Sequence, residues 1–260
     1  MNMKWKAALA VGFLAGAVLL SGCGGEKKEA AKANADVIRV GSETTYPPFE
    51  FTEGEKYVGF DIDLADAVIR EMGGKMEFKS MGFDALIPAI QSGQIDMAIA
   101  GMDITPEREK QVSFSDIYYD QTGYVIIVPK DNTTIHDWND LEGKVIGAQV
   151  GTQQAKYATE VKNSQVKQFD SNSQAFMELK AATVEAVVID APVGMYYLKQ
   201  GADKDFKLVG TPKDNAGFAI AMKKDNKELQ EKVNKALKKI KENGEYQKIY
   251  DKWFGASEKK

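Results

Sequence analysis

Signals for strands and helices alternate along this chain from Val37 onward, and this alternation constrains the fold more than any other feature of the sequence. Two helices are expected in the first half, over residues 61–72 and 84–91. Asp61 can cap the first of them, and Gly73-Gly74 can stop it. Strands are expected around these helices, over residues 37–40, 75–81 and 95–100. This β-α-β-α-β order is typical of a parallel sheet covered by helices.

The same alternation starts again after residue 123. A long amphipathic helix then follows, because Asp225 and Glu228 have the spacing of a capping box and apolar residues recur at helical intervals as far as Ile240. Gly244 interrupts it, and residues 246–253 form a last helical piece. Two α/β units of similar size are therefore expected, most simply as two lobes with a cleft between them. In the second unit, strands are expected over residues 124–128, 144–148, 166–169 and 186–189, and helices over residues 153–161, 174–182 and 195–199.

The N-terminus carries an apolar run of about 14 residues after Lys4 and Lys6. The run is shorter than the ~20 residues of a spanning helix and suits a secretory signal over residues 1–22. It ends in Leu-Ser-Gly-Cys23, which resembles a bacterial lipobox and predicts a lipid on the only cysteine; the alternative is a free or buried cysteine. Polar residues 23–36 are predicted to form a tether. The expected location is extracytoplasmic and membrane-anchored, at the cell surface or in the periplasm.

Charge and composition exclude several classes of function. Removal of Lys4 and Lys6 with the signal peptide shifts the net charge from −4 to −6, and an acidic protein is a poor partner for nucleic acid. His136 is the only histidine. A histidine-dependent triad or a multi-histidine metal site is therefore not expected, and no cofactor or metal is predicted.

Polar residues cluster directly after the expected strands, which is where open α/β sheets bind their ligands. The segments are residues 41–50, 101–108 and 149–153, and Asp190 follows the strand at 186–189. Phe83 opens the short helix of the first unit. These positions predict a ligand site built from both units.

Five segments carry a resemblance to a known family. They are YPPFEF at 46–51, GFDIDLADAV at 59–68, the stretch from FDALIPAI to SDIYY at 83–119, GTQQAKYA at 151–158 and ALKKIKENGEYQKIYDKWFG at 236–255. In their order and spacing they resemble the polar amino-acid-binding proteins of bacterial ABC transporters, which form cluster 3 of the solute-binding proteins. The stretch GMDITPEREKQVSFS at 101–115 is most similar to arginine-binding members.

The resemblance implies an α/β fold of the type II periplasmic-binding-protein kind, with two Rossmann-like parallel or mixed sheets. A hinge would join the lobes by two crossings, at residues 118–122 and 214–218. The first lobe would then comprise residues 37–117 and 219–260, and the second lobe residues 123–213. The implied protein is a monomer that is not an enzyme and that delivers its ligand to an ABC permease in the membrane.

The family's binding residues carry over to this chain position by position. Arg108 matches the arginine that grips the ligand α-carboxylate, a task for which a guanidinium fork is better suited than lysine. Asp190 matches the acid that takes the α-ammonium, together with the Gly101 carbonyl and Asp103. Further contacts are expected from Met102, Gln149, Thr152 and Gln153.

The ligand side chain would lie between Tyr46 and Phe83, with Glu43 at its far end. Three acids against Arg108 leave the predicted site negative, and a buried unpaired charge is costly. A cationic amino acid restores the balance, with L-arginine favoured and lysine and histidine as further candidates. The alternatives are binding of glutamine or another polar amino acid, and an enzyme like cyclohexadienyl dehydratase in which Glu43 or Asp103 acts as a general acid.

Overall fold

The computed structural model describes residues 36–120 and 123–255. The predicted signal peptide, Cys23 and all but the last residue of the predicted tether lie outside these ranges, and so does the end of the chain from residue 256. Within the described ranges, no helix is both long and apolar enough to cross a membrane.

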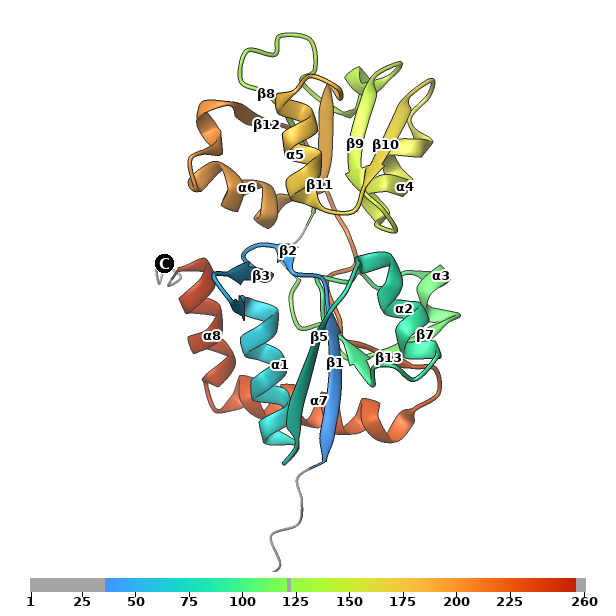
Figure 1. The fold of residues 1–260 in the computed structure, drawn as a ribbon, viewed down its shortest axis with the longest axis vertical. Coiled ribbons are helices and arrows are strands. Elements are labelled where there is room, and N and C mark those ends of the chain that lie inside the picture. Colours follow the sequence, from blue (N-terminus) through green and yellow to red (C-terminus); the bar gives the residue numbers. More distant parts are fainter. Residues whose placement is uncertain (1–35, 121–122, 256–260) are drawn as a thin grey trace, which may run out of the picture. The chain divides into compact units, whose positions relative to one another are not determined.

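The first lobe is built on a five-stranded sheet with the order β5-β1-β6-β13-β7 (Figure 1). Strand β1 runs parallel to β5 and β6, whereas β13 is antiparallel to β6 and β7. The strands are β1 (Val37–Ser42), β5 (Lys75–Ser80), β6 (Met97–Ala98), β7 (Val112–Phe114) and β13 (Ala221–Lys223). The helices are α1 (Phe60–Glu71), α2 (Phe83–Gln91), α3 (Pro106–Glu109), α7 (Lys227–Glu242) and α8 (Glu245–Phe254).

A small antiparallel sheet belongs to the same lobe and was not anticipated from the sequence. It consists of β2 (Thr45–Tyr46), β3 (Glu50–Glu53) and β4 (Lys56–Val58). Its strands are two to four residues long, too short for a periodic signal. The sheet holds the segment between β1 and α1 in place, and this segment contains several residues of the site described below.

The second lobe is built on another five-stranded sheet, with the order β10-β9-β11-β8-β12. Strand β9 is parallel to β10 and β11, and β8 is antiparallel to β11 and β12. The strands are β8 (Tyr124–Pro129), β9 (Val145–Gln149), β10 (Gln165–Phe169), β11 (Ala186–Asp190) and β12 (Phe206–Lys213). The helices are α4 (Gln153–Glu160), α5 (Asn172–Lys180) and α6 (Ala191–Lys199), with 3₁₀ turns η1 (Trp138–Leu141) and η2 (Ala202–Lys204).

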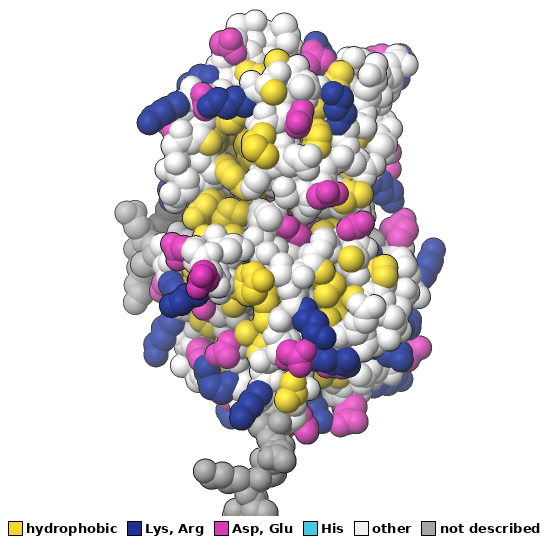
Figure 2. Space-filling model, viewed as in Figure 1, with side chains coloured by type: hydrophobic (Ala, Val, Ile, Leu, Met, Phe, Trp, Pro, Cys, Tyr) yellow, Lys and Arg dark blue, Asp and Glu magenta, His cyan; other side chains and the backbone are white. Residues whose placement is uncertain are grey.

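Buried strands and the apolar faces of the helices form the cores. Residues 125–128 of β8 are fully buried, as expected for a central strand covered on both faces. Helix α7 places Val233, Leu237 and Ile240 in the core of the first lobe and exposes its lysines. On the face shown in Figure 2, basic and acidic side chains of the described residues are intermixed, so that face presents no single-sign field.

The chain passes between the two sheets twice. It leaves the first sheet after Phe114 and enters the second at Tyr124, and it returns between Lys213 and Ala221. Phe218 in the returning segment pairs with Tyr119 in the outgoing one. The predicted hinge ranges lie in these two segments, and residues 121 and 122 are outside the described part. Bending at these segments stays a prediction.

Two helix starts differ from the sequence prediction. Helix α1 begins after Gly59, and Asp61 lies fully buried inside its first turn, because its carboxyl accepts hydrogen bonds from elsewhere in the fold. Helix α7 is capped by Asn226, whose side chain accepts from the Leu229 N–H at 3.2 Å. Asp225 has a φ of 62° and precedes the cap, so the predicted capping box with Glu228 is wrong. The predicted strand at 95–100 is shorter, with only Met97–Ala98 paired as β6.

Candidate ligand-binding site

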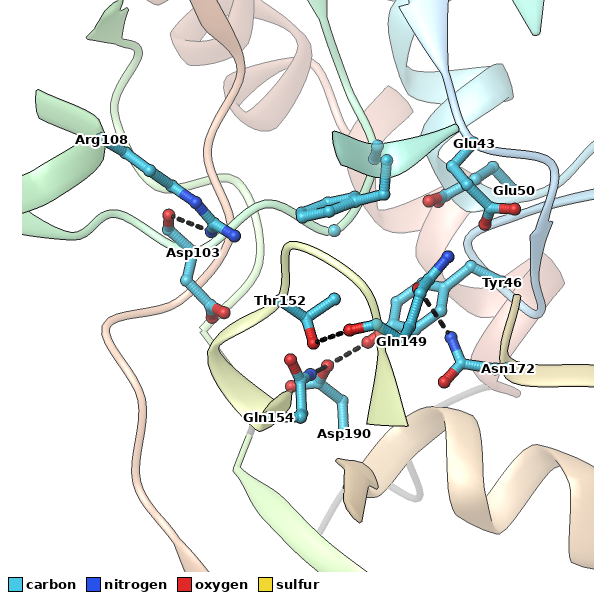
Figure 3. A pocket seen from close by; sticks show the side chains of 13 residues that line it. Glu43, Tyr46, Glu50, Asp103, Arg108, Gln149, Thr152, Gln154, Asn172 and Asp190 are labelled. Atoms are coloured by element: carbon cyan, nitrogen blue, oxygen red, sulfur yellow. Dashed lines mark hydrogen bonds between the residues drawn. The ribbon is translucent and has the colours of Figure 1, made fainter. Parts of the chain in front are cut away.

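A cavity lies where strand ends of the two lobes meet (Figure 3). The space between its lining atoms amounts to about 360 Å³, and part of it is open to solvent. The first lobe contributes residues that follow β1 and β6, and the second contributes residues at the ends of β9 and β11. The predicted residues that line the cavity are Glu43, Tyr46, Phe83, Gly101, Asp103, Arg108, Gln149, Thr152 and Asp190.

Two predicted residues lie elsewhere. Met102 is 1% exposed and packs in the apolar core beside α2. Gln153 is half-buried and lines shallower hollows outside the cavity. The roles predicted for these two residues stay predictions. The lining also contains Glu50, Ala100, Gln154 and Asn172, which the sequence reasoning did not single out.

Arg108 is positioned by the short helix α3. Thr105 caps this helix by accepting from the Arg108 N–H at 3.2 Å, and Pro106 occupies its first turn. The guanidinium is buried, and it donates to the Asp103 carbonyl at 2.9 Å and to the Gly151 carbonyl of the second lobe at 3.1 Å. Its carbon lies 5.1 Å from the centre of the Phe83 ring. Burial lowers the pKa of Arg108, but the group remains a cation at neutral pH.

Asp190 ends strand β11 and is 1% exposed. Its carboxyl accepts hydrogen bonds from the Tyr46 hydroxyl, from the Gln154 amide and, at 3.2 Å, from the Asn215 amide. Burial, and then the nearby charge of Asp103, raises the pKa of Asp190 well above its ordinary value. Tyr46 belongs to the first lobe, so this carboxyl bonds to both lobes at once.

Asp103 lies beside Arg108 at one end of the cavity (Figure 3). One of its carboxyl oxygens accepts from the Tyr124 hydroxyl at 3.0 Å, and the other is buried without a hydrogen-bond partner in the part of the chain that the structure describes. Burial raises the pKa of Asp103 to about 6, and the charge of Arg108 opposes that rise. Asp103 is thus an acceptor with a free oxygen next to a cation.

Glu43 and Glu50 lie close together, away from Arg108 (Figure 3). The Glu43 carboxyl accepts from the Thr45 hydroxyl at 2.6 Å and from the Thr45 N–H at 3.1 Å, and burial raises its pKa. Glu50 is fully buried, and neither of its carboxyl oxygens has a hydrogen-bond partner among the described residues. Burial, and then the charges of Asp61 and Glu43, raises the pKa of Glu50 well above its ordinary value. The Glu43 carboxyl therefore has hydrogen-bond donors within the chain, whereas the Glu50 carboxyl has none among the described residues.

The aromatic residues of the cavity have partners of their own. Phe83 faces the Arg108 guanidinium, and Tyr46 stacks on Phe49 with ring centres 5.8 Å apart. Gly101 lies against Tyr46, because a Cβ at this glycine would be 2.8 Å from the tyrosine ring. Its φ of 51° adds a second reason for glycine. The predicted sandwich of a ligand side chain between Tyr46 and Phe83 stays a prediction.

The side chains of the second lobe near the cavity form a hydrogen-bonded set. Thr152 caps α4 by accepting from the Ala155 N–H at 3.2 Å and donates to the Gln149 carbonyl at 2.7 Å. Asn172, which begins α5 just after β10, donates to the Gln149 side chain at 2.9 Å. The strand-end rule that identified Gln149 also applies to Asn172, and Glu50 belongs to the YPPFEF motif. Both residues therefore left a signal in the sequence.

Among the described residues, every buried side-chain nitrogen or oxygen that lacks a hydrogen-bond partner is a carboxyl oxygen. These atoms are both oxygens of Glu50 and one each of Asp61 and Asp103. Arg108 is the only basic residue among the thirteen that line the cavity. In the described ranges no group of His, Cys, Asp or Glu side chains has the arrangement of a metal site. Three of these four oxygens, those of Glu50 and Asp103, belong to residues that line the cavity, so the cavity presents free acceptors and surplus acid to a donor-rich occupant.

Comparison with known proteins places the chain in a family. Residues 38–256 match the bacterial extracellular solute-binding proteins, family 3. The chain belongs to this family. The arginine-binding extracellular protein ArtP of Bacillus subtilis (strain 168) is 38% identical over 239 residues, which cover 90% of this chain and 92% of that protein.

Two solved structures of family members are similar over almost their whole length. An ancestral arginine-binding protein bound to arginine is 48% identical with a TM-score of 0.82, covering 86% of this chain and 100% of that one. An ancestral arginine-binding protein bound to glutamine is 50% identical with a TM-score of 0.78, covering 84% and 98%. The predicted family and the two-lobed type II fold are thus confirmed. These relatives are described as binding proteins, which agrees with the prediction that this family member is not an enzyme.

Proposed function

We propose that this protein binds a cationic L-amino acid, L-arginine before others, in the cavity between its lobes. The observation that carries the proposal is that three buried carboxyl oxygens of the lining, two of Glu50 and one of Asp103, have no donor among the described residues, while the lining contains one basic residue. L-Arginine brings an ammonium and a guanidinium, and the guanidinium alone supplies five N–H donors. The names of the relatives support the same ligand.

Each part of L-arginine has a counterpart in the lining. The α-carboxylate pairs with Arg108, whose donors now reach two carbonyl oxygens. The α-ammonium lies among Asp190, Asp103 and the Gly101 carbonyl. The guanidinium extends toward Glu43, along Tyr46 and Phe83, where contact with aromatic faces contributes about 0.5–2 kcal/mol. Thr152 and Gln149 complete the wall.

Ligand binding would close the two lobes by bending at the crossings near residues 118–122 and 214–218. A ligand favours the closed form only if it makes contacts there that the open form lacks. Arg108 from the first lobe and Asp190 from the second would supply that difference by holding opposite ends of the α-amino acid group. The closed protein, as a monomer, would then deliver its ligand to an ABC importer.

The proposed location is the outer side of the membrane, with a lipid on Cys23. Family membership supports an extracytoplasmic site, and the lipobox-like motif supports the anchor. Mass spectrometry of the mature N-terminus, with Cys23→Ala as the comparison, tests the lipid. An unmodified Cys23 in the membrane fraction would contradict the anchor.

A second candidate ligand is glutamine, because one similar structure is described as bound to glutamine. Thermal unfolding at saturating arginine, lysine, histidine and glutamine separates the candidates, since a ligand at 100 times its Kd stabilises by about 2.7 kcal/mol. We expect the largest rise in Tm with arginine. A larger rise with glutamine than with any cationic amino acid would refute the argument from charge.

A further inference from the structure

Glu50 is the most poorly satisfied acid of the cavity. It lies in β3, is fully buried and lines the cavity, yet no described residue donates a hydrogen bond to either of its oxygens. Its neighbour Glu43 accepts two hydrogen bonds from Thr45. A buried carboxyl without a donor is unfavourable unless it is neutral or receives a donor from outside the chain. The two acids at this end of the cavity are therefore not equivalent.

The surroundings of Glu50 favour its neutral form, first through burial and then through nearby charges. The groups that act on it most strongly are acids: Asp61 from α1, Glu43 from the loop after β1, and Asp190 from β11. The hydroxyls of Tyr46 and Tyr118 also belong to this environment. The acids disfavour a negative charge on Glu50, and none of these groups carries a positive charge that would offset it.

Asp61 is the acid that acts most strongly on Glu50. Its carboxyl uses one oxygen to accept from the Gly101 N–H at 2.9 Å and the Tyr118 hydroxyl at 2.7 Å, while its other oxygen has no hydrogen-bond partner among the described residues. These two bonds favour the ionised form of Asp61, and a negative Asp61 disfavours a second negative charge on Glu50.

We propose that Glu50, a buried carboxyl of the lining without a donor from the described chain, determines specificity for a cationic side chain by giving up its proton when the ligand's cation arrives. The proposal rests on the proposed function and assigns a role to an acid that the sequence argument left out. When the cation arrives, the Glu50 O–H bond breaks, the proton leaves to solvent, and the carboxylate accepts from the ligand N–H groups. A neutral side chain cannot drive this exchange, because it leaves an ionised Glu50 among other acids.

Citrulline isolates this exchange, because it has the shape of arginine with a neutral urea group at the end. Asp103 and Asp190 would meet the α-ammonium of both ligands, so their protons cancel in the comparison. Arginine should release one proton more than citrulline. Below the pKa of Glu50, each unit by which the pH is lowered should therefore reduce the affinity for arginine by about tenfold more than the affinity for citrulline.

The test is isothermal titration calorimetry of both ligands in phosphate and in Tris, which have different ionisation enthalpies and so report the protons released. The proteins are the wild type, Glu50→Gln, Glu43→Gln and a matched control, Glu53→Gln, which removes an exposed carboxyl from the same strand. For Glu50→Gln we expect an arginine affinity lower by about tenfold or more, no extra proton, and a citrulline affinity within about threefold of wild type. Glu43→Gln should keep the extra proton, and the control should match the wild type.

Each outcome decides between the two proposals. Equal proton release for arginine and citrulline in the wild type, or an unchanged arginine affinity in Glu50→Gln, overturns the role of Glu50 and leaves the proposed function standing. Failure of the wild type to bind any cationic amino acid overturns the proposed function itself. If Glu50→Gln does not fold, the wild-type proton count and Glu50→Asp, which keeps the carboxyl, decide the question.

Discussion

Arg108 offers the sharpest test of how the cavity would hold an amino acid. Its guanidinium makes bonds of 2.9 Å and 3.1 Å to the carbonyls of Asp103 and Gly151, and it lies 5.1 Å from the Phe83 ring centre. We consider Arg108→Lys, which keeps the charge but replaces the planar fork with one ammonium. Any loss of affinity then measures the geometry of the fork and not the charge.

The expected loss follows from the contacts that lysine cannot reproduce. The fork can make two hydrogen bonds to a carboxylate where an ammonium makes one, and one hydrogen bond that involves a charged group contributes about 1.5–3 kcal/mol. The expected loss is therefore about 10-fold to 150-fold in Kd for arginine. Titration calorimetry measures this loss directly.

Agmatine, which is arginine without its α-carboxylate, serves as the comparison ligand. Arg108→Lys should bind agmatine as weakly as the wild type does, because agmatine lacks the group that Arg108 would hold. Glu107→Gln, which removes the neighbouring exposed acid that bonds Lys156 at 3.2 Å, should change arginine affinity by less than about threefold. An arginine affinity of Arg108→Lys within threefold of wild type, or an equal loss for agmatine, would refute the assignment.

Two further predictions concern stability. Gly101→Ala should destabilise the protein by about 1–3 kcal/mol in urea unfolding and weaken arginine binding, because its Cβ would lie 2.8 Å from the Tyr46 ring. Gly93→Ala, with a φ of 74° and no atom near its Cβ, should show the conformational cost alone. Equal losses of stability in the two variants would contradict the steric argument. Burial raises the pKa of Asp61 from 3.8 to about 6, so its stabilising contribution is present below pH 3.8 and is lost as the pH rises through 6. The difference in unfolding free energy between the ligand-free wild type and Asp61→Asn should therefore fall by up to about 3 kcal/mol between pH 4 and pH 7. A difference that stays constant over this pH range would exclude the linkage.

The sequence predicted the two α/β units because long apolar strands and amphipathic helices leave periodic signals. It predicted most of the cavity lining by the rule that ligands lie beyond strand ends. The small sheet β2–β4 was missed because its strands are too short for a period to be recognised.

Side-chain direction limited the prediction of the site. Gln153 and Gln154 are adjacent in α4, yet only Gln154 turns toward Asp190, and the sequence does not state which face of the first turn meets the other lobe. Asp61 looked like a helix cap because it precedes an apolar stripe. Its real partners, Gly101 and Tyr118, are 40 and 57 residues away in sequence.

The arrangement of Gln149 and Asn172 has a consequence for neutral solutes. The Gln149 amide donates to the Asp170 carbonyl at 3.1 Å, and the Asn172 amide donates to the Gln149 side chain at 2.9 Å. Each amide gives one of its two N–H donors to the chain, and this bond fixes the direction in which its second donor points. A neutral solute would have to match that direction, so discrimination among neutral amides would come from geometry as well as from the preference of the site for a cation.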